Sequence, residues 1–135
     1  MQGIINQPVY SNSLIDRAKL LLGTIEASLT KEQVNPKDLT VEHVMPQKLK
    51  KEWQEMLGKN HGTIHKKLLH TLGNLTLTGY NSELSNKPFE EKLRLLRASN
   101  LTLNQYFQKV DVWNEEAIIS RAKYLTERAV KVWPR

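Results

Sequence analysis

Cysteine is absent from this chain of 135 residues. Its absence excludes disulfide bonds, zinc sites built on thiolate ligands and enzymes that use a cysteine nucleophile. Because disulfides persist mainly in oxidising compartments, a chain without cysteine leads us to expect a cytoplasmic location.

Long hydrophobic runs are also missing. No apolar run approaches the roughly 20 residues that a membrane-spanning helix needs. Residues 1–10 lack the basic start and the apolar stretch of a signal peptide. The hydrophobic fraction of 39% is nevertheless sufficient for a compact core. We therefore expect a single domain over residues 1–135 that does not associate with a membrane.

The balance of charge is positive. Lysine and arginine number 20 against 14 aspartates and glutamates, which gives a net charge of +6 and a pI of about 9.6. A basic surface attracts polyanions, and the phosphate backbone of nucleic acid is the commonest of these. The charge alone does not identify a partner, because many basic proteins bind no nucleic acid.

Both ends of the chain show helical periodicity. Residues 12–29, residues 103–109 and the segment after Asn114 carry apolar side chains at the spacing of one helix face. Asn114 suits an N-cap, and Glu115 and Glu116 follow it in the first turn, where negative charge is favourable. We expect helical flanks over residues 12–29 and 103–133.

The centre of the chain predicts two strands. Residues 39–45 (LTVEHVM) are rich in β-branched side chains and end at Pro46, and residues 72–78 (LGNLTLT) alternate leucine with threonine. Between them, residues 48–57 and 63–70 look helical, and a further helix runs from Pro88 to about residue 98. An isolated hairpin is marginal in water, so helices must pack against it. The predicted fold is α+β and mostly helical, with one two-stranded antiparallel hairpin.

Four polar residues lie in or beside these strands. Glu42 and His43 come near the end of the first strand, Asn74 opens the second, and Asn81 follows it. Carboxylate and amide oxygens are hard ligands that suit Mg²⁺ or Mn²⁺. A histidine with a pKa of about 6.5 can accept a proton from water at neutral pH. These groups are what metal-assisted hydrolysis of a phosphodiester requires.

The order of these residues resembles a nuclease motif. The stretch LTVEHVMPQ, followed by LGNLTLTGYNSELSNKPFEEK, is similar to the HNH or ββα-metal (His-Me finger) motif. More narrowly, it resembles the C-terminal nuclease domain of GmrSD-type modification-dependent (Type IV) restriction endonucleases. The likeness extends to both helical flanks and covers nearly the whole chain. It implies a ββα-metal core over about residues 39–98.

The resemblance assigns roles to individual residues. Glu42 matches the first metal ligand, and His43 matches the general base that activates the attacking water. Asn74 matches the middle Asn of the motif, which usually braces the loop. Asn81, rather than Asn86, matches the second metal ligand. About 30 residues separate His43 from Asn74, a longer insertion than many HNH sites have.

Four basic residues in or just before the helix predicted to begin at Pro88 are expected to contact DNA. Lys87 and Lys92 are expected to contact phosphate, and Arg94 and Arg97 lie on the helix that in HNH folds runs beside the substrate. The resemblance thus implies a metal-dependent endonuclease that acts on double-stranded DNA with one Mg²⁺ or Mn²⁺, in a restriction system for phage defence. It also implies a partner, because the full family protein carries an N-terminal nucleotide-hydrolysing recognition domain.

Two other functions stay open from the sequence. One is a non-catalytic nucleic-acid-binding module on an HNH scaffold. The intact Glu42, His43 and Asn81 argue against that module, because a decayed site tends to lose those residues first. The other is a helical protein-interaction domain that docks a partner through its last helix, for which DNA affinity would not depend on salt.

The remaining histidines have competing interpretations. His61 and His65 have the i, i+4 spacing of a zinc pair, but the nearby sequence offers no cysteine or obvious carboxylate, and surface positions are favoured. His70 either lines the cleft or packs. For the lysines of the helical insertion, DNA contact and a solvated helix face are equally supported; these are Lys48, Lys50, Lys51, Lys66 and Lys67. The three tryptophans are expected in the core: Trp53, Trp113 and Trp133.

Overall fold

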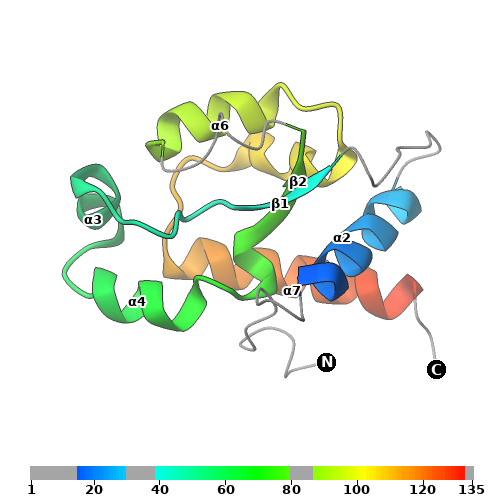
Figure 1. Ribbon diagram of the computed structural model, residues 1–135, viewed down its shortest axis with the longest axis horizontal. Helices are drawn as coiled ribbons and strands as arrows, with labels where there is room; N and C mark the ends of the chain where they lie inside the picture. The colour runs from blue at the N-terminus through cyan, green and yellow to red at the C-terminus, as the bar shows by residue number, and fades with distance from the viewer. Residues whose placement is uncertain (1–14, 30–38, 80–86, 133–135) are drawn as a thin grey trace.

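The computed structural model of the chain describes residues 15–29, 39–79 and 87–132. Within these residues it confirms a mostly helical α+β fold with one two-stranded antiparallel sheet (Figure 1). In chain order, the elements are α2 (Ile15–Leu29), β1 (Thr40–His43), α3 (Lys51–Leu57), α4 (His61–Leu68), the 3-10 helix η2 (Leu72–Asn74), β2 (Leu75–Thr78), α6 (Phe89–Arg97), the 3-10 helix η3 (Thr102–Lys109) and α7 (Glu115–Val132). No helix of the described segments is long and apolar enough to cross a membrane.

The two predicted strands pair as a hairpin. β1 and β2 are antiparallel, with Glu42 opposite Thr76 and His43 opposite Leu75. β1 ends at His43, so it is shorter than the predicted strand and stops before Pro46, which cannot donate to a ladder. The end of the hairpin that carries Glu42 and His43 therefore borders the helical insertion, which is the segment between the two strands, residues 44–74.

The start of the predicted second strand is wrong. Residues 72–74 form a turn of 3-10 helix, and the extended conformation begins only at Leu75. The reason is a close approach to α7, because a Cβ atom at Gly73 would overlap the carbonyl oxygen of Ile118. Only glycine allows the backbone to lie this close to the helix.

The helices pack on both sides of the hairpin. Figure 1 shows α6 above it, α7 below it, and α3 and α4 together at one end. α2 contacts both strands, η3 contacts β2, and α7 contacts η2. These contacts supply the packing that a two-stranded sheet needs to be stable.

Two groups of buried apolar side chains form the core. The first joins the helical insertion to α6 and the start of α7, and includes Val44, Met45, Trp53, Leu68, Phe89, Phe107 and Trp113. The second lies between α2, the hairpin and α7, and includes Leu22, Ile25, Leu39, Leu75, Leu77 and Leu125. Leu39 belongs to the second group and Val44 to the first, so Glu42 and His43 lie where the two groups meet.

Two of the tryptophans confirm the predicted core positions. Trp53 and Trp113 are fully buried, and the ring of Phe89 lies between them, with centroids 5.7 Å and 6.0 Å away. The Trp53 Nε1–H donates to the carbonyl oxygen of Lys87 at 3.0 Å, so its polar atom keeps a partner. Trp133 lies outside the described residues.

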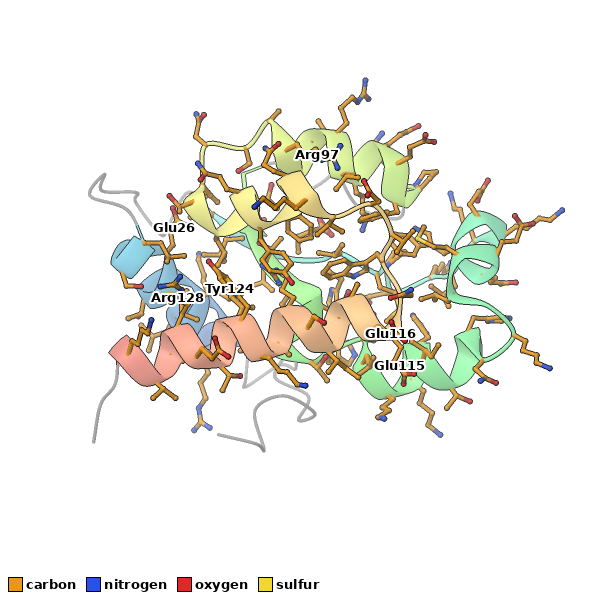
Figure 2. The ribbon with its side chains drawn as sticks, turned by 180° about the vertical axis from the view of Figure 1, so that it is seen from behind. Glu26, Arg97, Glu115, Glu116, Tyr124 and Arg128 are labelled. Carbon is orange, nitrogen blue, oxygen red and sulfur yellow. The ribbon has the colours of Figure 1, made fainter. Side chains whose placement is uncertain are left out.

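Polar contacts fix the helix ends. The side chain of Asn114 accepts from the Ala117 N–H at 3.0 Å and so confirms the predicted N-cap of α7. The carboxylate of Glu26 in α2 accepts from the Thr102 N–H at 2.9 Å and from the Leu103 N–H, at the start of η3. Figure 2 shows Glu26 reaching from α2 toward η3, on the face where Tyr124 of α7 lies.

A buried arginine joins α7 to the hairpin. Arg121 is fully buried, and its Nη1 donates to the carbonyl oxygens of Gly73, at 3.1 Å, and Leu75. Its guanidinium lies 5.1 Å from the Phe107 ring centroid and 5.8 Å from that of Tyr106. Burial lowers the pKa of Arg121 to about 10, so the side chain still carries its charge at neutral pH.

Candidate active site

Glu42 and His43 are buried at the end of β1. Their exposed fractions are 9% and 5%. Neighbours on a regular strand point to opposite faces. Lys92 of α6 nevertheless reaches both residues: its Nζ donates to the His43 carbonyl oxygen at 2.7 Å and lies 3.8 Å from Glu42 Oε1. One buried ammonium thus attaches α6 to the end of β1.

Burial dominates the electrostatics of this pair. It raises the pKa of Glu42 to about 7, and the positive charge of Lys92 opposes that rise. Burial also lowers the pKa of Lys92 to about 8, against the favourable effect of the Glu42 carboxylate. A carboxylate in such a site gains more from a second nearby cation than an exposed one would, because little water screens the interaction.

A second histidine lies against His43. The Nε2 of His43 and the Nδ1 of His70 are 3.1 Å apart, and the two rings meet edge to face, with centroids 5.2 Å apart and an angle of 68°. Burial, followed by the positive charges of His70, Lys92 and His65, lowers the pKa of His43 to about 3. The His43 imidazole is therefore neutral at pH 7. Burial and His65 also lower the pKa of His70.

Asn74 holds the chain just beyond His43. Its Oδ1 accepts from the Met45 N–H at 2.7 Å and from Trp113 Nε1–H at 3.0 Å. Its Nδ2 donates to the carbonyl oxygens of Met45 at 3.0 Å and Leu69 at 2.9 Å. Its own carbonyl oxygen accepts from the Val44 N–H at 2.9 Å. These contacts are those of a residue that braces the loop after β1.

The expected second metal ligand cannot be placed. Asn81 and the alternative Asn86 lie outside the described residues. Within the described ones, no group of three or more histidines, aspartates and glutamates is arranged to hold a metal ion. The described part of the site therefore offers one carboxylate, that of Glu42, which precedes His43 in β1.

The zinc interpretation of His61 and His65 finds no support in the described residues. Both lie in α4, but the Nε2 of His65 is 2.9 Å from the carbonyl oxygen of Pro46, and no third ligand accompanies them there. His65 thus connects α4 to the loop that follows β1. His70, left open by the sequence, contacts the site through His43.

The four predicted DNA contacts have different surroundings. Lys87 and Arg94 lie toward the surface, and Lys87 pairs with Glu91 at 3.5 Å. Arg97 donates to the carbonyl oxygens of Phe107 at 3.0 Å and Val110 at 2.8 Å, so it joins α6 to the end of η3. Lys92 is fully buried and binds protein groups instead of facing solvent. Phosphate contact by any of them stays a prediction.

The sequence contained a signal for the position of Lys92. It comes three residues after Phe89 and four before Leu96, both of which are buried. Residues at this spacing share one helix face. The helical pattern therefore places Lys92 on the buried face of α6, where it reaches β1. The contact between His43 and His70 had no comparable local signal.

Comparison with known families assigns the chain to a family. The family described as GmrSD restriction endonucleases, C-terminal domain, matches residues 4–128. No curated protein matches the chain. The family match spans most of the chain and includes both strands, α6 and most of α7. The chain thus belongs to the C-terminal domains of the GmrSD restriction endonucleases, a nuclease family.

Proposed function

We propose that this chain is an HNH-type, metal-dependent endonuclease domain that cuts double-stranded DNA. The observation that carries the proposal is that Glu42 and His43, adjacent in the chain, are both buried at the end of β1, in a chain of a restriction endonuclease family. The succession of β1, β2 and α6 is consistent with a ββα-metal core. The buried Lys92 supports this arrangement, since it joins the helix to the strand.

The donor set fits Mg²⁺ or Mn²⁺ bound through few protein ligands. Mg²⁺ commonly keeps several waters and takes one or two carboxylates together with substrate phosphate. Glu42 would supply the carboxylate, and Asn81 would supply an amide oxygen. The buried carboxylate has one cationic neighbour at 3.8 Å, Lys92, and a second positive charge would stabilise its ionised form. A bound divalent ion would neutralise the charge that develops on the phosphate and the leaving 3′ oxygen.

His43 accepts the proton of the attacking water. Its neutral imidazole has the lone pair that this step needs, and the negative charge of a bound phosphate would raise its pKa from the value of about 3 that burial gives it. The imidazolium that results is stabilised by the negative charge of the substrate phosphate beside it. Asn74 and Lys92 hold the backbone at and after His43, so the ring keeps its position during the step. The expected products carry a 5′ phosphate.

The lysines of the helical insertion support binding to a polyanion. Six exposed lysines and two glutamates lie in residues 48–67, so this segment carries +4 of the net charge of +6. The lysines are Lys48, Lys50, Lys51, Lys59, Lys66 and Lys67. The segment adjoins the loop after β1 through His65, whose Nε2 lies 2.9 Å from the Pro46 carbonyl oxygen. We propose that DNA phosphates approach the site along α3 and α4.

The choice of DNA is proposed to reside elsewhere. The family is named as a C-terminal domain, so a recognition domain that hydrolyses nucleotides is the expected partner, either in the same chain or in another one. In this arrangement His43 cuts, and the partner domain selects the DNA. A role in defence against phage is proposed on the same resemblance.

A metal titration combined with a nicking assay tests the proposal. The chain should bind Mn²⁺, and it should nick supercoiled plasmid with Mn²⁺ but not with EDTA. Glu42→Gln should weaken Mn²⁺ binding by about 10-fold or more, because it removes the charged ligand. Glu127→Gln serves as the matched control, since Glu127 is an exposed carboxylate of α7. A chain that binds DNA but neither binds Mn²⁺ nor nicks would instead be a non-catalytic nucleic-acid-binding module.

A further inference from the structure

We propose that a pocket between η3 and α7 binds a nucleotide, with its base against Tyr106 and Tyr124 and its phosphate beside Lys109. The pocket has a volume of about 430 Å³, and small-molecule sites commonly have volumes of about 300–1,000 Å³. None of its described residues belongs to the site at the end of β1. The inference therefore goes beyond the proposed function and does not depend on cleavage.

The 3-10 geometry of η3 sorts its side chains onto separate faces. Residues three apart are eclipsed in such a helix. One row, with Asn104 and Phe107, is buried in the fold. Two other rows line the pocket; they are Thr102, Gln105 and Gln108, and Tyr106 with Lys109. η3 thus presents amide, aromatic and ammonium groups to the pocket while its remaining row holds it in place.

Two tyrosines form an aromatic wall in this pocket. Tyr106 of η3 and Tyr124 of α7 are both half-buried, and their ring centroids are 5.0 Å apart at an angle of 42°. Figure 2 shows Tyr124 between α7 and η3. Every nucleobase has a flat π-face that stacks on such rings, whatever its sequence. The wall therefore suits the base of a nucleotide.

The charges around the aromatic wall are positive. Lys109 is exposed in the lining, and the guanidinium of Arg128 lies 5.3 Å from the Tyr124 ring centroid. None of the described lining residues is acidic. Glu26 approaches the start of η3, but its carboxylate oxygens accept from two backbone N–H groups there. A phosphate attached to the stacked base would thus meet cations.

A buried arginine adds a positive charge next to the same wall. The guanidinium of Arg121 is fully buried and lies 5.8 Å from the Tyr106 ring centroid. Among the described residues no carboxylate pairs with it, and its Nε and Nη2 have no hydrogen-bond partner. A buried charge without a counterion attracts a nearby anion strongly, because little water screens the interaction. A phosphate in the pocket would supply the missing negative charge.

Titration of the full chain with deoxyadenosine monophosphate tests the inference without metal or cleavage. In nitrogen-15 NMR spectra the nucleotide should shift the amide signals of Tyr106, Lys109 and Tyr124. Deoxyadenosine should shift the same signals with weaker affinity, because it lacks the phosphate. No shift of these signals by the nucleotide, or the same shifts with inorganic phosphate alone, would overturn the inference.

Three variants separate the contributions of the base and the phosphate. Tyr124→Leu keeps an apolar side chain without the ring and should weaken nucleotide binding by about 10-fold. Lys109→Ala should weaken it by about 2- to 5-fold and should leave deoxyadenosine binding unchanged. Lys123→Ala is the matched control, since Lys123 is exposed on α7 and does not line the pocket.

Two results with these variants would overturn the inference. One is an unchanged nucleotide affinity in a folded Tyr124→Leu variant. The other is an equal effect of Lys109→Ala and Lys123→Ala on nucleotide binding. Lys109 is exposed, so its variant keeps the test valid even if Tyr124→Leu does not fold.

A free nucleotide and a nucleotide in an unpaired strand share this chemistry, and a short deoxyadenosine oligonucleotide distinguishes them. Tighter binding of the oligonucleotide, lost in Tyr124→Leu, identifies an unpaired strand as the ligand, and equal affinities identify a free nucleotide. Shifts with a blunt DNA duplex but not with the nucleotide would overturn the inference. A wild type that does not nick DNA with Mn²⁺ would refute the proposed function and leave this pocket unaffected.

Discussion

Asn74→Ala is the substitution whose cost the structure defines most fully. The Asn74 side chain is fully buried and makes four hydrogen bonds. Alanine would leave four groups without these partners: the N–H and C=O of Met45, the C=O of Leu69 and the indole N–H of Trp113. Each buried polar group that loses its partner costs about 1–3 kcal/mol. Even at the low end, the four together cost about 4 kcal/mol.

This loss is large compared with the stability of a domain of this size. Domains are typically stable by about 5–15 kcal/mol, so the variant should be marginally folded. The melting temperature should fall by about 10–15 °C, since about 1 kcal/mol corresponds to roughly 3 °C at this chain length. Nicking activity should fall as well, because the Met45 backbone that follows His43 loses its support.

Urea and thermal unfolding of matched variants measure the effect. Asn114→Ala removes one half-buried capping bond from α7 and should cost only about 1 kcal/mol. The structure predicts the difference between the two variants in the free energy of unfolding that each substitution removes. If Asn74→Ala loses no more free energy of unfolding than Asn114→Ala, the bracing role of Asn74 is refuted.

Two further predictions concern charge. Lys92→Met should destabilise the fold by about 1–3 kcal/mol in urea unfolding, because it leaves the buried His43 carbonyl oxygen without its donor and Glu42 without its cation. The double variant with Glu42→Gln should recover part of that loss, and no recovery would show that the two side chains are not coupled. Replacing Lys50 and Lys51 with alanine should make the salt dependence of DNA binding shallower by up to about 2 in the log–log slope, measured by fluorescence anisotropy. An unchanged slope, or an equal change in a control pair on α7, would refute a DNA path along α3; the control pair is Lys123 and Lys131.

The helices and the hairpin follow from local patterns. The apolar stripes of α2, α6 and α7 and the alternation of leucine with threonine in β2 can be recognised in short windows. The N-cap at Asn114 is equally local. Such features are predictable because the residues that decide them are neighbours in the chain.

The remaining differences come from contacts between distant segments. The 3-10 turn at residues 72–74 depends on the approach of Gly73 to Ile118, 45 positions later in the chain. The pairing of His43 with His70 spans 27 positions. Neither contact leaves a periodic signal in the sequence. The sequence could therefore identify the individual residues but could not predict that they lie in contact.

Lys92 shows where a general tendency conflicts with a local pattern. Lysine is rarely fully buried, and this tendency favours a surface role in phosphate binding. The helical spacing from Phe89 places it on the buried face, and the structure follows the spacing. The burial of Lys92 depends on Glu42 and the His43 carbonyl, which a sequence pattern does not bring together.

Chemical rescue of His43→Ala tests the central claim most directly. The wild-type chain should nick plasmid DNA with Mn²⁺, and His43→Ala should lose about 100-fold or more of that rate, as expected for removal of a general base. Imidazole added to the buffer should restore part of the rate, since the substitution empties the space of a buried ring. Nicking by His43→Ala at the wild-type rate would contradict the account.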